Sequence, residues 1–296
     1  MKIGFIGLGH MGSPMATRLC QTGFDVTVFD LIPTAVATLV KVGATAAVDI
    51  ASLAQHCAII ITMLPQGEHV EAVYLGENGL FAHAKVGTLF IDCSSIGVDT
   101  TRQLASLATR QGYSHLDAPV SGGMSGAING TLTFMVGGKF NDFNQAASVF
   151  AAMGNHCVHA GDHGNGQAAK ICNNMLLGIS MIATSEAFVL ANKLGLDKQV
   201  FFDIAANASG QCWSLTQYCP VPGPVPSSPA NHDYQPGFST AMMLKDLRLS
   251  QAAAAKVGAS TPLGAQATAL YTLLNNHGLN QADFSAIIKL LQGDLT

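Results

Sequence analysis

The sequence predicts an α/β fold with a doubly wound, mostly parallel sheet in the first half of the chain. Two observations lead to this prediction: apolar runs of strand length alternate with helical patterns, and a glycine-rich turn joins the first run to the first helical pattern. Such alternation is typical of a parallel sheet covered by helices. The length of 296 residues is enough for two domains of ordinary size.

The expected strands share short apolar runs that end at small or polar residues. They are residues 2–6, 25–30, 58–63, 88–92, 115–118, 133–137 and 157–159. Ligands of doubly wound sheets bind beyond the carboxyl ends of the strands. Leu64, Pro65, Ser94 and Ser95 follow two of these ends, so they are candidates for contact with a cofactor. Ordinary turns at strand ends are an equally good interpretation.

The composition favours a protein that acts on a small molecule. Hydrophobic residues make up 49% of the chain and charged residues only 11%, which is more apolar material than one compact monomer usually needs. We therefore expect a homo-oligomer. The net charge is −4, and Lys and Arg form no cluster. A partner such as nucleic acid or an anionic membrane is not expected.

The sequence shows no pattern typical of a membrane span or a signal peptide. No uninterrupted apolar run approaches the ~18 residues of a membrane span, and the first seven residues lack the pattern of a signal peptide. The seven cysteines show no Cys-x-x-Cys spacing, so a disulfide framework is not expected. We expect a cytoplasmic protein with reduced thiols.

The turn after the first strand has the pattern Gly-x-Gly-x-x-Gly. Its residues are Gly7, Leu8, Gly9, His10, Met11 and Gly12. The first glycine permits a sharp turn, the second lets the backbone approach a pyrophosphate, and the third lets the helix pack on the strand. The helix N-terminus then offers N–H groups and partial positive charge to the phosphates. The pattern predicts a dinucleotide site.

Asp30 ends the next strand and indicates which dinucleotide binds. A carboxylate there can bind the ribose hydroxyls of NAD, but it repels the 2′-phosphate of NADP. The residues that follow, from Leu31 to Thr34, include no Arg or Lys to hold that phosphate. We expect NAD as the cofactor, with Leu31 beside it.

A helical pattern from about residue 164 to residue 193 carries candidate catalytic residues. At ~1.5 Å per residue it spans roughly 40 Å, long enough to link two domains. Lys170 and Asn174 lie four residues apart, so they share one helical face. Burial among uncharged neighbours would lower the pKa of such a lysine and suit it to act as a base. A lysine extended along a helix surface fits the pattern equally well.

Four blocks resemble the β-hydroxyacid dehydrogenase family, in the family's order and along the whole chain. They are residues 5–16, residues 117–123 with Ser121, Gly122 and Gly123, residues 164–174, and residues 243–247 with Lys245 and Asp246. The resemblance implies a Rossmann-type domain over residues 1–163. A linking helix and an all-helical domain over residues 164–296 would follow, in a homodimer or homotetramer. Helical patterns near residues 199–207, 240–256, 262–276 and 284–291 agree.

The resemblance also implies the roles of individual residues. Lys170 would be the general acid/base, and Asn174 would orient the substrate hydroxyl or the lysine. Ser121, Gly122 and Gly123 would hold the substrate carboxylate. Lys245 would approach the nicotinamide end of the cofactor, and Asp246 would contribute to substrate binding from the second domain. The chain departs from the family at His69 and Cys93, where relatives often have asparagine and serine.

The segment around Trp213 and Tyr218 bears on the substrate. It precedes a proline-rich stretch, so we expect it to be a loop rather than a helix. It resembles the loop of family members that act on 3-hydroxyisobutyrate, and an aromatic wall suits a methyl-branched substrate. The implied reaction is NAD-dependent oxidation of 3-hydroxyisobutyrate to methylmalonate semialdehyde, a step of valine catabolism. L-serine and tartronate semialdehyde are the alternative substrates within the family, and the two aromatic residues also fit a purely structural role.

Two other classes of protein are weighed against this interpretation. His156, Cys157, His159, Asp162 and His163 are metal-ligand types close in sequence, but they lack the spacing of known metal motifs. We therefore expect no metal site. A non-catalytic cofactor-binding protein is the second alternative, and the presence of both Lys170 and Asn174 speaks against it.

Overall fold

The computed structural model describes residues 2–294 of the chain. The chain divides into two compact units, Met1–Lys170 and Ile171–Thr296, and each is described by itself. The division falls inside one long helix, α10 (Asn165–Lys193). The expected domain boundary between residues 163 and 164 lies seven residues earlier in the chain, just before this helix begins.

The first unit is built on a nine-stranded sheet with the order β3-β2-β1-β4-β5-β6-β8-β7, in which β9 pairs with β8. The strands are β1 (Lys2–Ile6), β2 (Asp25–Phe29), β3 (Thr45–Ala46), β4 (Ile59–Thr62), β5 (Leu89–Asp92), β6 (Ser114–Asp117), β7 (Val120–Ser121), β8 (Leu132–Gly138) and β9 (Gly154–Gly161). Pairing is parallel from β3 to β6 and antiparallel where β8 meets β6 and β7. The predicted doubly wound, mostly parallel sheet is confirmed.

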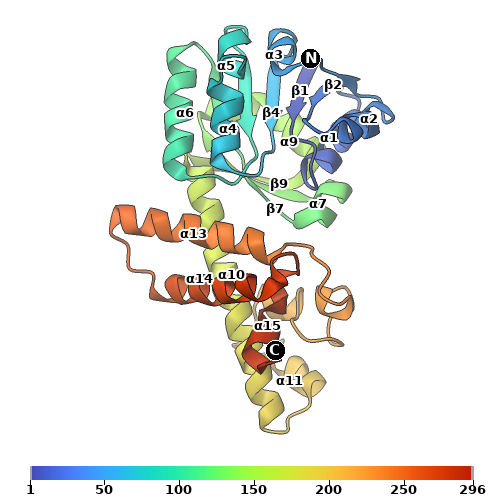
Figure 1. Ribbon diagram of the computed structural model, residues 1–296, viewed down its shortest axis with the longest axis vertical. Helices are drawn as coiled ribbons and strands as arrows, with labels where there is room; N and C mark the ends of the chain where they lie inside the picture. The colour runs from blue at the N-terminus through green and yellow to red at the C-terminus, as the bar shows by residue number, and fades with distance from the viewer. Residues whose placement is uncertain (1, 295–296) are drawn as a thin grey trace. The chain divides into compact units, whose positions relative to one another are not determined.

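Helices cover both faces of this sheet (Figure 1). One face packs against α1 (Gly12–Gln21), α2 (Pro33–Val40), α7 (Gly123–Asn129) and α9 (Ala147–Met153). The other packs against α3 (Ile50–His56), α4 (Gly67–Leu75), α5 (Leu80–His83) and α6 (Val98–Arg110). Alternate side chains of one strand enter the two cores, as Ile59 and Ile60 do. Burial on both faces explains the continuous apolar runs of the central strands.

The strand predictions are confirmed to within a few residues, and the short strands β3 and β7 are additions. Each added strand is only two residues long, too short to leave an apolar pattern. The last strand, β9, is eight residues long rather than the expected three. All eight of its residues are exposed or half-buried, so hydrophobicity alone marks only its centre. Backbone pairing with β8 defines its true extent.

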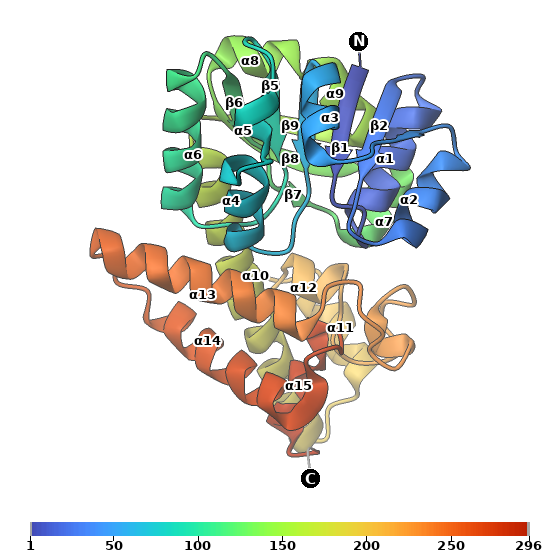
Figure 2. The ribbon, with the colours of Figure 1, turned by 45° about the horizontal axis from the view of Figure 1, so that its top comes forward.

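The second unit is helical throughout its regular structure. Its helices are the greater part of α10, α11 (Lys198–Ala205), α12 (Trp213–Thr216), α13 (Thr240–Val257), α14 (Pro262–Leu274) and α15 (Ile287–Gln292), with short turns at Pro229–Asn231, Asn275–Leu279 and Phe284–Ala286. Figure 2 shows α13 and α14 packed side by side. The Ser239 hydroxyl caps the start of α13, and Gly258 ends it with a positive φ of 68°. The expected all-helical C-terminal domain is confirmed.

The prediction that Trp213 lies in a loop is wrong. Trp213 begins the four-residue helix α12, and the prolines follow only after this helix has ended. Proline breaks a helix when it lies in the helix interior, and it disfavours the helical conformation at the residue that precedes it. It does not prevent a helix that ends several residues before it. The segment from Pro220 onward is irregular, apart from the short turn at Pro229–Asn231.

Within residues 2–294, α10 is the one helix long and apolar enough to cross a membrane by length and composition. The core helix of a soluble protein meets the same criterion. Polar residues are spread along α10, so no uninterrupted apolar run in it reaches the length of a membrane span. Five of them are buried in the protein: Gln167, Lys170, Asn174, Thr184 and Ser185.

Candidate functional site

The glycine-rich turn joins β1 to α1 and has the geometry that a dinucleotide requires. Gly7 has a φ of 93°, and a Cβ there would lie 2.3 Å from the carbonyl oxygen of Met63. A Cβ on Gly12 would lie 1.9 Å from the carbonyl oxygen of Gly7. Gly9, by contrast, has open space where a Cβ would be. The first and third glycines are therefore needed by the protein itself, and the second leaves room for a ligand.

Asp30 follows β2 and turns its carboxylate toward the glycine turn. Its Oδ2 accepts a hydrogen bond from Leu8 N at 2.6 Å, and its Oδ1 accepts one from Ile32 N at 2.8 Å. Next to it, Leu31 is 87% exposed, an apolar surface free to pack against a flat ring. The start of α1 has no side-chain cap. An uncapped helix N-terminus, an open Gly9 and a carboxylate at the end of β2 fit the phosphates and ribose of a dinucleotide.

The other two predicted cofactor segments are joined to each other. Leu64 N donates to the Ser94 hydroxyl at 2.9 Å, linking the loop after β4 to the loop after β5. Ser94 is fully buried, whereas Ser95 is half-buried and Pro65 is exposed. Ser94 therefore acts as a brace between the loops. Ser95 and Pro65 remain the candidates for direct contact.

Asp117, at the end of β6, holds the beginning of α10. Its Oδ1 accepts from Gly164 N at 2.8 Å, and its Oδ2 accepts from Gln167 N at 3.0 Å. Burial raises the pKa of Asp117 to about 6, although the N–H donors act in the opposite direction. The carboxylate occupies the N-terminus of the helix, where both the free N–H groups and the helix dipole favour it.

The side-chain amide of Gln167 makes two further hydrogen bonds that hold the start of α10. Its Nε2 donates to the carbonyl of Ser94 at 2.7 Å, and its Oε1 accepts from Ile96 N at 3.1 Å. The first turn of α10 is thus tied both to β6 and to the loop after β5. Gly166 makes the close approach possible, because a Cβ there would lie 2.4 Å from the Met135 carbonyl oxygen. This network determines where Lys170 lies.

Lys170 is buried, with 7% of its surface exposed, and its Nζ donates to the carbonyl oxygen of Val120 at 2.8 Å. Val120 and Ser121 form β7, and Gly122 and Gly123 follow with φ values of 127° and 60°. The interpretation of Lys170 as a surface lysine is excluded by its burial. Lys170 and the predicted carboxylate-binding loop come together within the first unit.

In the second unit, Asn174 and Asp246 are partners. Both are 2% exposed, and the Asn174 amide donates to Asp246 Oδ2 at 2.5 Å. Asp246 Oδ1 has no hydrogen-bond partner among the described residues and lies 3.9 Å from Lys245 Nζ. The third and fourth sequence blocks are therefore joined by this pair. Asn174 itself accepts from the Asn173 amide at 3.0 Å, so its own carbonyl oxygen is already engaged.

Trp213 and Tyr218 form an aromatic stack in the second unit. Their ring centroids are 4.9 Å apart with an interplanar angle of 21°, and Tyr218 stacks in turn on Phe284 at 5.4 Å. Trp213 is half-exposed at the end of the stack. One face of the outermost ring is thus available to an apolar group.

Several residues noted in the sequence have other surroundings. His69 is exposed on α4, and burial raises the pKa of the Cys93 thiol. Within the described part of the chain, no group of three or more His, Cys, Asp or Glu side chains is arranged to hold a metal ion. Of the histidine-rich segment near β9, His159 bonds the Gly138 carbonyl and His163 lies against the His115 ring.

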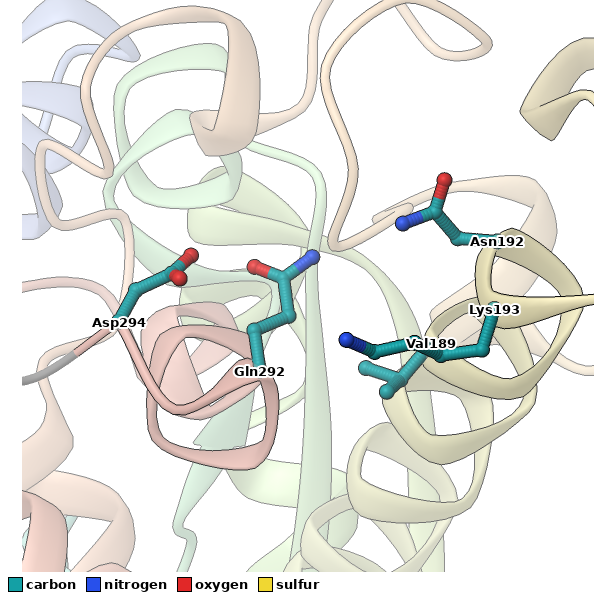
Figure 3. Close-up of a pocket in the computed structure, with 5 residues that line it drawn as sticks. All are labelled: Val189, Asn192, Lys193, Gln292 and Asp294. Atoms are coloured by element: carbon teal, nitrogen blue, oxygen red, sulfur yellow. The ribbon is translucent and has the colours of Figure 1, made fainter. Parts of the chain in front are cut away.

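The second unit contains a cavity of about 150 Å³. Figure 3 shows its lining, which comes from the end of α10 and from the C-terminal segment. The lining residues are Val189, Asn192, Lys193, Gln292 and Asp294. No residue predicted to bind cofactor or substrate is among them.

Sequence reasoning missed Asp117, Gln167 and Asp283 as residues that organise the site. Asp117 left one signal, since it is the first residue of the block 117–123 that resembles the family's substrate-binding loop. Gln167 and Asp283 left none, because their partners lie far away in the sequence.

Comparison with known proteins now defines the class. A family model described as the NAD binding domain of 6-phosphogluconate dehydrogenase matches residues 2–161. A second, described as "NAD-binding of NADP-dependent 3-hydroxyisobutyrate dehydrogenase", matches residues 164–291. These matches confirm an NAD-binding dehydrogenase. The chain belongs to the β-hydroxyacid dehydrogenase family.

Individual relatives cover nearly the whole chain. A 3-hydroxyisobutyrate dehydrogenase of Pseudomonas aeruginosa is 48% identical over 98% of this chain and 98% of its own length. An NAD-dependent L-serine dehydrogenase of the same organism is 46% identical over 98% of this chain and 97% of its own length. A solved structure of the Mycobacterium tuberculosis 3-hydroxyisobutyrate dehydrogenase with L-serine has a TM-score of 0.94 and 45% identity, covering 98% of this chain and 99% of that one.

Proposed function

We propose that the protein oxidises 3-hydroxyisobutyrate to methylmalonate semialdehyde, as in valine catabolism. The observation that carries the proposal is the buried Lys170, held beside the Ser121–Gly123 loop by its bond to Val120. NAD supplies the hydride acceptor when it is bound. The substrate therefore has to lose a hydroxyl proton, and a neutral lysine amine is a suitable acceptor for that proton.

The residues proposed for the site have separate tasks. In the first unit, the N–H groups of Gly122 and Gly123 and the Ser121 hydroxyl hold the substrate carboxylate. Lys170 takes the hydroxyl proton during oxidation and returns it during reduction. In the second unit, Asn174 orients the substrate hydroxyl, and its amide is held by Asp246. Lys245 approaches the nicotinamide end of the cofactor.

The aromatic stack favours a methyl-branched substrate. Burial of a methyl group against the open face of Trp213, which Tyr218 supports from behind, would stabilise the bound state by roughly 1 kcal/mol. A protonated amine at the same place would lose water and would need a new partner. The half-exposed Trp213 ring offers an apolar face and no charge. This difference supports 3-hydroxyisobutyrate over serine.

L-serine is the second candidate, and one feature favours it. Asp246 Oδ1 is buried, accepts no hydrogen bond from the described residues and forms an ion pair with Lys245 Nζ at 3.9 Å; a carboxylate oxygen can accept from a second ammonium group. A relative named as a serine dehydrogenase is similar to this chain over almost its full length. Tartronate semialdehyde has neither a methyl nor an amine group and is favoured by neither feature.

A panel of substrates decides between these candidates. Catalytic efficiency is measured with NAD for 3-hydroxyisobutyrate, L-serine and 3-hydroxypropionate, which lacks the methyl branch. We expect 3-hydroxyisobutyrate to be oxidised most efficiently, and Trp213→Ala to remove most of its advantage over 3-hydroxypropionate. Phe201→Ala, in α11, is the matched aromatic control and should keep that advantage. A higher efficiency with serine would make serine the substrate.

We also propose a homodimer or homotetramer located in the cytoplasm. Leu176 and Leu190 lie on α10 and are 63% and 60% exposed, an apolar surface that a second copy can cover. Light scattering after size-exclusion chromatography measures the oligomeric state. A monomer at micromolar concentration would contradict the proposal. Fractionation of cells that express the protein tests the location.

A further inference from the structure

Asp283 lies at the centre of the second unit's polar network. It is fully buried, and both carboxylate oxygens are used. Oδ1 accepts from the backbone N–H and the hydroxyl of Ser285, at 3.0 and 2.7 Å. Oδ2 accepts from the Tyr218 hydroxyl at 2.9 Å and from the N–H groups of Gly237 and Phe238, at 3.0 and 3.1 Å. The carboxylate therefore accepts from five donors.

One of these donors belongs to the aromatic stack. Tyr218 is its middle ring, between Trp213 and Phe284, so the position of its hydroxyl determines the tilt of the ring. The space around the hydroxyl is close-packed, because a Cβ on Gly237 would lie 2.5 Å from it. The Tyr218 ring therefore has little freedom to rotate while Asp283 accepts its hydrogen bond. The exposed Trp213 ring rests directly on it.

The other donors on Oδ2 lead to the helix that carries Lys245 and Asp246. Gly237 and Phe238 precede α13 by a few residues. The backbone of Asp283 also forms an isolated β-bridge with Ser239, which is the N-cap of α13. The Thr240 N–H donates to the carbonyl of Ala282 at 2.8 Å. The Asp283 side chain thus holds the aromatic stack and the two residues that lead toward α13, and the backbone of Ala282 and Asp283 pairs with the start of that helix.

We propose that Asp283 is a positioning residue for substrate selectivity. It holds the Tyr218–Trp213 stack in a fixed position relative to α13, the helix that carries Asp246. It acts through the Tyr218 hydroxyl and touches no reacting atom. The inference rests on the proposed function, because it assumes that the stack contacts the substrate's methyl group. Its electrostatic basis is simple: a buried carboxylate with several N–H and O–H donors makes strong, directional bonds.

The test is a double-mutant cycle of Tyr218→Phe and Asp283→Ala, with Ser285→Ala as the matched control. Tyr218→Phe removes only the hydroxyl that bonds Oδ2, and Ser285→Ala removes only the hydroxyl that bonds Oδ1. The chain has a single tryptophan, Trp213, so its fluorescence reports the stack directly. Accessibility of Trp213 to acrylamide, KM and kcat for 3-hydroxyisobutyrate and 3-hydroxypropionate, and the melting temperature are measured for each variant.

We expect Tyr218→Phe to raise acrylamide quenching and to raise KM for 3-hydroxyisobutyrate about threefold or more, with kcat and KM for NAD nearly unchanged. The preference over 3-hydroxypropionate should fall by a similar factor. Ser285→Ala should leave quenching and preference as in the parent. If Asp283 acts through the hydroxyl, the double variant should be no worse in preference than Asp283→Ala alone.

Two results would overturn the proposal. One is unchanged quenching and preference in Tyr218→Phe, and the other is additive losses of preference in the double variant. If Asp283→Ala does not fold, the comparison of Tyr218→Phe with Ser285→Ala decides alone. A parent enzyme that prefers serine would contradict the proposed substrate, whereas the quenching data would still decide whether Asp283 holds the stack.

Discussion

Lys170 Nζ donates a hydrogen bond to the carbonyl oxygen of Val120, 2.8 Å away, in the strand that leads directly to Ser121. The amine is therefore held beside the loop proposed to bind the substrate carboxylate. Asp117 and Gln167 fasten the first turn of α10, directly before the turn that carries this lysine. The arrangement places a proton acceptor on a rigid element, as general base catalysis requires.

Replacing Lys170 by alanine should lower turnover by about 10²–10⁴-fold, the usual contribution of a positioned acid/base. NAD affinity should change little, because the glycine turn and Asp30 are separate from it. Lys193→Ala, an exposed lysine of the same helix, is the control and should keep full turnover. Steady-state kinetics and NAD titration measure both quantities. A Lys170→Ala enzyme within about threefold of the parent would remove this lysine from the mechanism.

The same role predicts how activity depends on pH. Oxidation of the alcohol requires the neutral amine, and it releases a proton overall, so its rate should rise toward alkaline pH. Reduction of the aldehyde requires the protonated amine and should be favoured at lower pH. Initial rates in both directions between pH 6 and 10 measure this. Profiles that rise together in both directions would contradict the assignment.

Substitutions of Gly9 and Gly12 should have different effects on NAD affinity and on the stability of the fold. Gly9→Ala meets nothing within 4 Å, so the melting temperature without ligand should stay as in the parent. Its NAD affinity should fall about tenfold, since a new methyl group would stand where the pyrophosphate approaches. Gly12→Ala places a Cβ 1.9 Å from the Gly7 carbonyl oxygen and should also reduce stability, by about 1–3 kcal/mol. Thermal unfolding and NAD titration measure the two effects. Unaltered NAD affinity in Gly9→Ala would place the pyrophosphate elsewhere.

Asp30 should give a preference for NAD over NADP of about tenfold or more in catalytic efficiency, the ratio that corresponds to ~1.4 kcal/mol. Because its carboxylate also accepts from Leu8 N, alanine would disturb the turn as well as the charge. Asp30→Asn retains an oxygen acceptor and removes the charge, so it should narrow the preference with less loss of NAD activity than Asp30→Ala. Asp25→Asn, at the exposed start of β2, is the control. Equal efficiencies with both cofactors in the parent would refute the charge argument.

His115 should make the fold sensitive to acid. It is buried between the rings of Tyr74 and His163, and burial, followed by the charge of His163, lowers its pKa to about 3. The unfolded chain binds this proton near pH ~6.5, whereas the folded protein does not until far lower pH. The stability that neutral His115 contributes is therefore present above pH ~6.5 and lost as pH falls, by roughly 1.4 kcal/mol per unit.

Asp92 and Asp117 act in the opposite direction in an overlapping window. Burial raises the pKa of each to about 6, so the stability they contribute is full below ~3.9 and is lost as pH rises to about 6. Comparison of His115→Phe with the parent cancels the two carboxylates, since both proteins contain them. As the pH falls from 6.5 to 4.5, the free energy of unfolding of the variant should increase by about 2–3 kcal/mol relative to that of the parent. Denaturant unfolding at each pH measures this difference, and His232→Phe serves as an exposed control. Stability profiles of His115→Phe and the parent that run parallel across this pH range would contradict the prediction.

Local patterns in the sequence determined the parts of this protein whose causes are local. The glycine turn, the strand before it and Asp30 lie within thirty residues and each has one physical task, so the dinucleotide site and the sheet could be predicted. Lys170 and Asn174 were found through the resemblance of their block to a family. The burial that makes Lys170 a credible base could not be read from that block, because Val120 lies fifty residues away along the chain.

Tertiary structure alone decided which polar groups meet. Gln167 bonds Ser94 and Ile96, and Asp283 bonds Tyr218 across 65 residues of sequence. No periodicity encodes such partners, since a buried carboxylate or amide must find donors wherever the fold brings them. Trp213 shows the same limit in secondary structure, because its short helix forms where packing supports it, ahead of the prolines. Local sequence thus determines the longer elements that carry a clear apolar pattern, and long-range packing determines short elements such as α12 and the partners of the buried polar side chains.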